Sequence, residues 1–348
     1  MNLAAGPPGR HGGREAVPQL NLPTCDVGTA CPCCAGTTFV PYLSEDEIAK
    51  EIELRHNFIF KRLDHTPQPT ELMDLTEFMH GGPGRLMACS RCGVVIRDEA
   101  QAAHYEDDFY DPALMNHLYP KYLTAFREKA PLYRELLESG ANVVELGSHF
   151  GAFLQTAEEW NWRPIGIDIG ASTSEFSRAR GLTVRHQSIS EFSLRRSRAD
   201  ALFIWNCFEQ LETPGDTLVE AHRLLQPHGL LVVRVPNFGF YANWRRRMWN
   251  GSAQTAIRRL GHNNLLGFPY RFGYTAPALT RLLRQSGFDP LAGHDANLIT
   301  MPFPAMPRWV KREYSEVRKD GVRVRNEQEQ DPETVAGPWI EIVSRRAA

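Results

Sequence analysis

The 348-residue sequence lacks three features that would each point to a particular class of protein. It has no apolar run that approaches the about 20 residues a membrane-spanning helix requires. It has no excess of either charge, and a formal net charge of −2 argues against nucleic-acid binding driven by bulk charge. Its Gly- and Pro-rich first 20 residues contain no apolar segment of the kind that secretion signals carry. We therefore expect a cytoplasmic globular protein that has a disordered tail over residues 1–24.

The sequence also lacks the G-x-G-x-x-G pattern that cradles a pyrophosphate. In its place, the largely apolar residues 143–146 predict a buried strand. A glycine-bearing turn joins this strand to a predicted helix over residues 150–160. Gly147 in this turn can adopt backbone angles that are closed to other residues. The N–H groups at the start of the helix face a ligand that lies against the turn. This order of elements predicts a nucleotide-binding geometry.

A second predicted strand, residues 164–169, contains Asp168, which follows Gly147 by 21 positions. An acid about 20 residues beyond the glycine turn holds ribose hydroxyls in Rossmann-like units. Glu145 precedes Gly147 by two residues, where a carboxylate would repel a pyrophosphate and suit a cationic amino-acid group. Together these residues indicate a nucleoside-containing cofactor that carries positive charge.

The pattern Glu145-x-Gly147-x-His149-x-Gly151 resembles motif I (E/D-x-G-x-G-x-G) of the class I S-adenosylmethionine-dependent methyltransferases, with His149 at the middle glycine. The run RLLQPHGLLVVRVPN, residues 223–237, is similar to the L-x-P-G-G strand of the same superfamily. The resemblance implies an α/β fold with a Rossmann-like, doubly wound, mostly parallel sheet. It also implies S-adenosyl-L-methionine as the cofactor and methyl transfer by in-line displacement.

The resemblance further assigns residues to the cofactor. These are Glu145, Gly147, Ser148, Gly151, Asp168, Ile169, Ser188, Ile189 and Asn206. The sequence departs from the family pattern beside Ser188, where relatives often carry an acid that contacts the adenine. It departs again at Gln210, which replaces a His that could act as a base.

Some methyl acceptors need a base to remove a proton, in addition to the positioning that an active site provides. The candidates are His149, His262 and Tyr270, with Glu209 behind them. We predict that His149, at the cofactor turn, faces the acceptor. Residues 238–273 are rich in Trp, Arg, Asn and Tyr, and we interpret them as an acceptor lid. The alternative for residues 245–247 is an amphipathic helix with a solvated Arg face.

Two C-x-x-C pairs, Cys31 with Cys34 and Cys89 with Cys92, have the spacing of zinc ligands. Four thiolates would close the coordination sphere, so the site would be structural and not catalytic. A CPxC pair followed by CxxCG resembles the N-terminal zinc module of a group of bacterial class I methyltransferases that includes sugar and natural-product C-methyltransferases. The alternative is a small apolar core that uses cysteine as a hydrophobic residue. Cys33 could substitute as a ligand.

We therefore expect a zinc-ribbon-like module over residues 25–103, with helical segments at residues 45–62 and 71–80. A helical connector over residues 104–140 follows, interrupted at Pro120, and a methyltransferase domain occupies residues 141–348. The Tyr-bearing residues 104–110 resemble a cofactor-contacting stretch of such proteins. The predicted function is methylation of a small-molecule acceptor such as a sugar, a lipid or a natural-product intermediate. An RNA or protein methyltransferase and a non-catalytic methyltransferase-like protein remain as alternatives.

Overall fold

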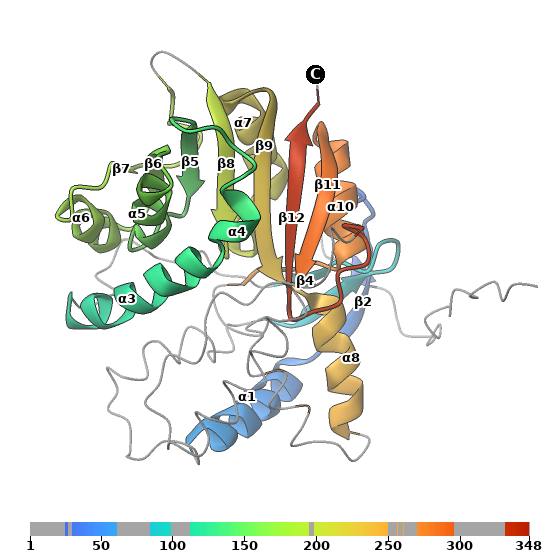
Figure 1. The fold of residues 1–348 in the computed structure, drawn as a ribbon. Helices are drawn as coiled ribbons and strands as arrows, with labels where there is room; N and C mark the ends of the chain where they lie inside the picture. The colour runs from blue at the N-terminus through green and yellow to red at the C-terminus, as the bar shows by residue number, and fades with distance from the viewer. Residues whose placement is uncertain are drawn as a thin grey trace, which may run out of the picture.

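The computed structural model describes residues 25–26, 30–60, 84–98, 112–194, 198–249, 256, 260, 270–295 and 331–347. Its larger part is a seven-stranded sheet with the order β11-β12-β9-β8-β5-β6-β7 (Figure 1). The strands are β5 (Asn142–Leu146), β6 (Arg163–Asp168), β7 (Val184–His186), β8 (Ala199–Trp205), β9 (Leu225–Pro236), β11 (Phe288–Asp295) and β12 (Trp339–Arg346). Strands β5 to β9 pair in parallel, and β12 pairs antiparallel with both β9 and β11. The predicted α/β fold with a mostly parallel sheet is confirmed.

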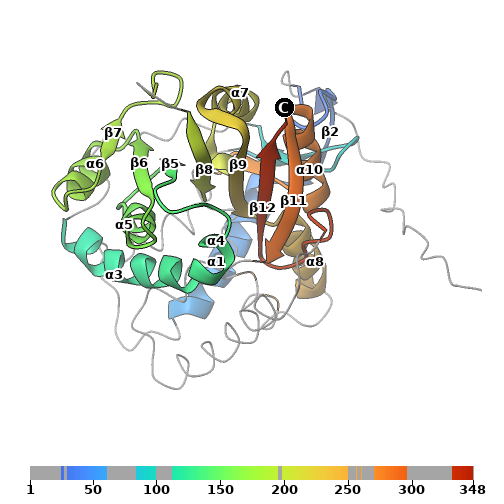
Figure 2. The same cartoon turned by 45° about the horizontal axis from the view of Figure 1, so that its top comes forward.

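Helices cover both faces of this sheet (Figures 1 and 2). One face carries α3 (Pro112–Glu128), α4 (Ala130–Tyr133) and α5 (Ala152–Glu159), and α6 (Ala171–Arg178) contributes Phe176 to the same apolar cluster. The other face carries α7 (Pro214–Leu224) and α10 (Ala276–Gln285). The alternation of side chains along a strand produces this division, because Phe203 of β8 joins the first cluster and Leu202 and Ile204 join the second.

The order of the strands reverses between β5 and β8. From β5 the chain steps outward through β6 to β7, and it then returns to the opposite side of β5 to form β8 and β9. In open parallel sheets, ligands bind beyond the carboxyl ends of the strands at such a switch point. In Figure 1 this edge of the sheet faces downward, toward α1 (Glu45–Phe60) and α8 (Phe238–Trp249).

A second, five-stranded sheet lies at the same edge. It has the antiparallel order β1-β2-β3-β4-β10, formed by β1 (Cys25–Asp26), β2 (Thr38–Leu43), β3 (Leu86–Cys89), β4 (Val95–Arg97) and β10 (Phe272–Gly273). Its last strand comes from the C-terminal part of the chain, and Tyr274 next to it bridges to Asn237 at the end of β9. The apolar side chains of Phe39 and Met87 share one buried cluster with Leu146 and Val233. The two sheets are therefore joined by a strand and a common core.

One local prediction was wrong. Pro120 does not interrupt its helix, because α3 runs through it and the break comes after Glu128. Proline removes one backbone donor, while the buried side chains of Leu118 and Leu123 fix the helix against the sheet on both sides of it.

The predicted helix over residues 71–80 and the segment 104–110 lie outside the described residues. Within the described ranges, no helix combines the length and the hydropathy that crossing a membrane demands.

Candidate active site

The turn after β5 is built around Gly147, whose φ is +71°. A Cβ at this position would lie 2.7 Å from Sγ of Cys207, so the turn has room only for glycine. Its N–H donates to the carbonyl of Ile167 at 2.8 Å, which ties the turn to β6. Gly151 (φ +73°) is the N-cap of α5. Because glycine has no side chain, this residue leaves the first N–H groups of the helix without a side-chain cap.

His149 occupies the left-handed region at φ +49°, the conformation that a motif glycine would take. Its ring stacks on Phe150 with centroids 3.6 Å apart and meets the edge of Tyr122 of α3 at 5.6 Å. Burial lowers the pKa of His149 to about 3, so the ring is neutral near pH 7 and is a weak proton acceptor. The histidine thus fits the motif backbone, while its ring packs against aromatic side chains.

Asp168, at the end of β6, faces the same turn. Its carboxylate accepts hydrogen bonds from the N–H of His149 at 2.7 Å, the N–H of Gly170 at 2.8 Å and Oγ1 of Thr173 at 3.0 Å. Burial raises the pKa of Asp168, and these three donors act against that rise. The next residue, Ile169, leaves 50% of its surface exposed beside the carboxylate.

Glu145 lies next to Asp168 across β5 and β6. The side chain of Glu145 is buried, and its Oε2 has no hydrogen-bond partner among the described residues. Burial raises its pKa well above the ordinary value, and the charge of Asp168 raises it further. The two carboxylates predicted from the sequence therefore lie close enough to repel each other.

The remaining predicted cofactor residues differ in their surroundings. The hydroxyl of Ser148 is buried against β6, where Gly166 leaves room for it. Ser188 donates through its N–H and its hydroxyl to Glu191, both at 2.9 Å, in a local turn. Ile189 belongs to the buried core. Asn206, at the carboxyl end of β8, is half-buried.

Asn206 belongs to a buried polar network behind the edge of the sheet. Its Oδ1 accepts a hydrogen bond from Nη1 of Arg234, a fully buried residue of β9 whose guanidinium lies 3.9 Å from the centroid of the Trp339 ring. Nε of Arg234 is 3.8 Å from the carboxylate of Glu341, which also contacts Nζ of Lys129. Burial lowers the pKa of Arg234 to about 9. This network fixes the end of β8 from inside the protein.

Glu209, which the sequence analysis named only behind the other candidates, is a second buried acid with a raised pKa at this edge. It lies on the short helix η1 (Phe208–Gln210) directly after β8. It is fully buried, and no other residue in the described part of the chain donates a hydrogen bond to its carboxylate oxygens. Burial raises its pKa to about 8, and its own backbone N–H and the charge of Arg234 oppose that rise. The neighbouring Gln210 was the sequence signal for this position, because it stands where the resemblance implied a His.

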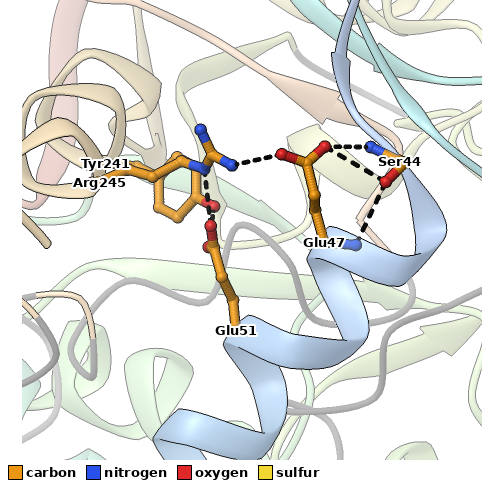
Figure 3. A network of polar contacts seen from close by, with 5 residues as sticks. All are labelled: Ser44, Glu47, Glu51, Tyr241 and Arg245. Atoms are coloured by element: carbon orange, nitrogen blue, oxygen red, sulfur yellow. Dashed lines mark hydrogen bonds and ion pairs between the residues drawn. The ribbon is translucent and has the colours of Figure 1, made fainter. Parts of the chain in front are cut away.

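The predicted acceptor lid is described only in part. His262 lies outside the described residues, and Tyr270 is buried, with its carbonyl accepting from Nε of Arg97 at 3.2 Å. Arg245 of α8 points toward α1, where it donates to Glu51 at 2.6 Å and to Glu47 at 3.1 Å (Figure 3). Arg245 therefore joins two helices, whereas residues 246 and 247 are exposed, as the amphipathic alternative predicted.

The four predicted metal ligands meet in one cluster. The sulfur atoms of Cys31, Cys34, Cys89 and Cys92 all lie within 4.8 Å of one another. Tetrahedral zinc with Zn–S bonds of about 2.3 Å requires sulfur atoms about 3.8 Å apart, so the cluster has the size of a zinc site. The residues after each pair, Ala35 (φ +54°) and Gly93 (φ +75°), take the same left-handed turn. Cys33 is buried and is not part of the cluster.

Comparison with known proteins agrees with this architecture. A family model described as a methyltransferase domain matches residues 115–292, just over half of the chain. A protein of Mycolicibacterium smegmatis named as a probable S-adenosylmethionine-dependent methyltransferase is 28% identical over 116 residues, which is 32% of this chain and 45% of that protein. The chain thus spans less than half of the length of this curated relative.

Solved structures with a similar fold have low sequence identity. A complex of the Haloferax volcanii Trm112 methyltransferase activator with a methyltransferase matches with a TM-score of 0.46 and 16% identity, covering 68% of this chain and 95% of that one. The plantazolicin methyltransferase BpumL in complex with SAH matches with a TM-score of 0.42 and 13% identity, covering 69% and 92%. The CcbJ methyltransferase of Streptomyces caelestis matches with a TM-score of 0.42 and 15% identity, covering 64% and 90%.

Proposed function

Because this chain belongs to the methyltransferase-domain family, we propose that it transfers the methyl group of S-adenosylmethionine to a small-molecule acceptor. The observation that carries the proposal is the pair of carboxylates on neighbouring strands at the switch point of the sheet, the buried Glu145 and the half-buried Asp168. S-adenosylmethionine has a ribose at one end and an ammonium group at the other, and two acids at this spacing match both groups.

The residues at this edge fit the cofactor chemically. Asp168 would hold the ribose hydroxyls, and the exposed side of Ile169 would cover the adenine. The buried Oε2 of Glu145, which has no partner among the described residues, would accept a hydrogen bond from the ammonium group. Gly147 and Gly151 would let the cofactor approach the main chain. When bound, the cofactor supplies a methyl group on a positively charged sulfur atom.

The other predicted contacts belong to the same proposal. Ser188 and Ile189 would border the adenine, Ser148 would support the turn, and Asn206 would face the methionine end from β8. For catalysis, Tyr270 comes from the lid side and His149 from the cofactor turn, and His262 stays a prediction from the sequence. The low pKa of His149 favours a role in shaping the site over a role as the base.

The acceptor is proposed to be a small molecule of the sugar, lipid or natural-product kind. A formal net charge of −2 gives the chain no bulk attraction for RNA. Plantazolicin, the natural product named for one structurally similar methyltransferase, is an acceptor of that kind. An RNA methyltransferase would instead show RNA binding that weakens steeply as salt is added.

The cysteine cluster is proposed to bind one structural zinc ion. Cys31, Cys34, Cys89 and Cys92 would supply four thiolates and leave no open coordination position. Since β4 follows the second pair and binds β10, the metal would hold the small sheet against the edge where the cofactor lies.

Two experiments test the proposed function in turn. Calorimetry with S-adenosylmethionine and with S-adenosylhomocysteine should show saturable binding of one molecule per chain. Incubation with methyl-tritiated S-adenosylmethionine and pools of phenols, amines, sugars and lipids should transfer label to an acceptor. A chain that binds neither compound is not a methyltransferase. A chain that binds both and labels no pool contradicts the small-molecule acceptor and leaves the RNA, protein and non-catalytic alternatives.

A further inference from the structure

The carboxylate of Glu209 is buried at the edge of the sheet where the acceptor would lie. It follows β8 directly, and no other described residue donates a hydrogen bond to either of its oxygen atoms. Burial of an ionisable group without hydrogen bonds destabilises a folded protein, so native structures rarely contain one without a functional reason.

Glu209 lies close to the cofactor turn because Cys207 connects the two. Cys207 is two residues before Glu209, and its thiol donates to the carbonyl of Leu146 at 3.3 Å. Burial raises the pKa of this thiol, and the negative charges of Glu209, Asp168 and Glu145 raise it further. Three carboxylates therefore surround one side chain at the turn. Two of them are assigned to the cofactor by the proposed function, and Glu209 is the third.

The main chain of Glu209 is held firmly while its carboxylate is not. Its carbonyl accepts a hydrogen bond from the N–H of Arg271 at 2.9 Å, immediately before β10. The preceding Phe208 is buried against Tyr274, with ring centroids 5.6 Å apart. A carboxylate on a fixed backbone, with no hydrogen bond from another described residue, is arranged to interact with a molecule that arrives later.

We propose that Glu209 is the general base of the methyl transfer. This inference rests on the proposed function and specifies its chemistry. Glu209 accepts the proton of the attacking acceptor atom while the electron pair of that atom forms the bond to the methyl carbon. The electrons of the broken carbon–sulfur bond stay on sulfur, which leaves methylated acceptor, S-adenosylhomocysteine and a protonated Glu209. Solvent then removes the proton.

The groups around Glu209 give it suitable basicity. Burial raises its pKa to about 8, and its own backbone N–H and then the charge of Arg234 on β9 keep it from rising further. Tyr274 beside β10 and Cys207 also face it, and both are uncharged near neutral pH because burial raises their pKa values. A base is most effective when its pKa is near the working pH, which favours Glu209 over His149 with its pKa of about 3.

The proposal restricts the class of acceptor. The attacking atom must carry both a free electron pair and a proton that it loses on methylation, as in a phenol, another hydroxyl or a neutral amine.

The test compares Glu209→Gln with Glu212→Gln, which makes the same chemical change at an exposed carboxylate three residues away that pairs with Arg271. Both variants should bind S-adenosylhomocysteine with wild-type affinity in calorimetry. With the phenol and amine pools, Glu209→Gln should lower kcat by about 10²- to 10⁴-fold, and Glu212→Gln should leave it within about twofold. The wild-type kcat should rise with pH up to about 8, and this limb should be absent in the residual activity of Glu209→Gln.

The result that overturns the inference is a Glu209→Gln enzyme that turns over at the wild-type rate with an unchanged pH profile. If the Gln variant does not fold, Glu209→Asp decides, because a carboxylate one carbon shorter should keep the pH limb and lower kcat. An Asp variant with the wild-type rate, or one without the limb, contradicts the role. Wild-type protein that binds no cofactor and labels no pool refutes the proposed function itself. If the wild-type protein binds the cofactor and labels an acceptor, but substitution of Glu209 changes neither kcat nor the pH profile, only this inference is refuted.

Discussion

The main-chain N–H of His149 donates to the carboxylate of Asp168 at 2.7 Å. This bond joins the turn after β5 to the end of β6, so the two halves of the predicted nucleotide site are fixed relative to each other by the fold. The carboxylate also accepts from Gly170 and Thr173, which orients it. Asp168 thus has both a structural role in the turn and the position to bind a ribose.

Asp168→Asn should weaken cofactor binding without unfolding the protein. The amide keeps the shape of the side chain and one acceptor oxygen, but it loses the negative charge. Hydrogen bonds to charged groups contribute about 1.5–3 kcal/mol, which corresponds to roughly 10- to 100-fold in Kd. Calorimetry with S-adenosylhomocysteine measures the change. Asp216→Asn, at an exposed acid in the first turn of α7, is the control and should bind normally. Equal affinities in the two variants would remove Asp168 from the site.

Gly147→Ala should cost more stability than a strained backbone alone explains. The positive φ costs about 1–2 kcal/mol for a residue with a Cβ, and that Cβ would also lie 2.7 Å from Sγ of Cys207. Gly181→Ala separates the two effects, because Gly181 has φ +82° and open space around its Cβ position. In urea unfolding, Gly181→Ala should lose only the strain, and Gly147→Ala should lose more. Adding Cys207→Ala should recover part of that difference, and no recovery would show that the clash is relieved elsewhere.

Purified protein should contain one zinc ion per chain, and Cys89→Ser should abolish it. The loss should also lower the thermal unfolding temperature, since a structural zinc site contributes directly to folding. Cys33→Ala is the matched control, because Cys33 is buried in the same module and lies outside the cluster. Metal analysis by mass spectrometry together with thermal unfolding checks both points. Equal metal content in the two variants would favour the alternative of a cysteine-lined apolar core.

Much of the fold could be predicted because its signals are local. The apolar runs that became β5, β6 and β8 are short, buried and parallel, which is why their sequences read as continuous hydrophobic segments. Thr275 is of a residue type that favours the N-cap of a helix, and its side chain accepts from the N–H of Ala278 at the start of α10 at 3.3 Å. The two cysteine pairs were predicted to converge from their spacing, and they do.

The parts that could not be predicted depend on contacts between distant segments. Nothing in residues 272–273 shows that they complete the sheet of the N-terminal module, since the pairing partner Val95 is far away in the sequence. The burial of Glu209 is equally invisible in its own sequence, because Arg234 and Tyr274 come from later elements. From the sequence, Arg245 could belong either to an acceptor lid or to the solvated face of a helix. Its partner Glu51 lies on α1, which is distant in the sequence and packs near α8 only in the folded structure.

Arg245→Ala should destabilise the protein through the carboxylate it leaves behind. Glu51 is only 2% exposed, and it contacts Nε of Arg245 at 2.6 Å and the hydroxyl of Tyr241 (Figure 3). Removal of one partner of a buried ion pair typically costs about 3–5 kcal/mol, and the partial exposure of Arg245 places this case near the lower end. Arg246→Ala, at the exposed next position, should change stability by no more than about 0.5 kcal/mol. Urea unfolding of the two variants compares them directly, and similar values would mean that the contact between α1 and α8 is not energetically significant.

The stability difference between wild type and Glu209→Gln should depend on pH with a definite sign. Burial raises the pKa of Glu209 from its ordinary value of 4.5, which applies to the unfolded chain, to about 8 in the folded protein. Between these values the folded state holds a proton that the unfolded state has lost, so the stabilisation from this group is complete below about pH 4.5 and decreases as pH rises. The slope of this stability difference against pH should approach about 1.4 kcal/mol per pH unit in that window and level off above pH 8.

Glu145 and Glu341 also have raised pKa values, but both are present in the variant, so their contributions cancel in the difference. Urea unfolding at pH 5.5, 7 and 8.5, each about one and a half units from the next, gives the three points needed. A difference that stays constant across them would show that the Glu209 carboxylate is ionised in the folded protein at neutral pH, and it would then require a hydrogen-bond donor.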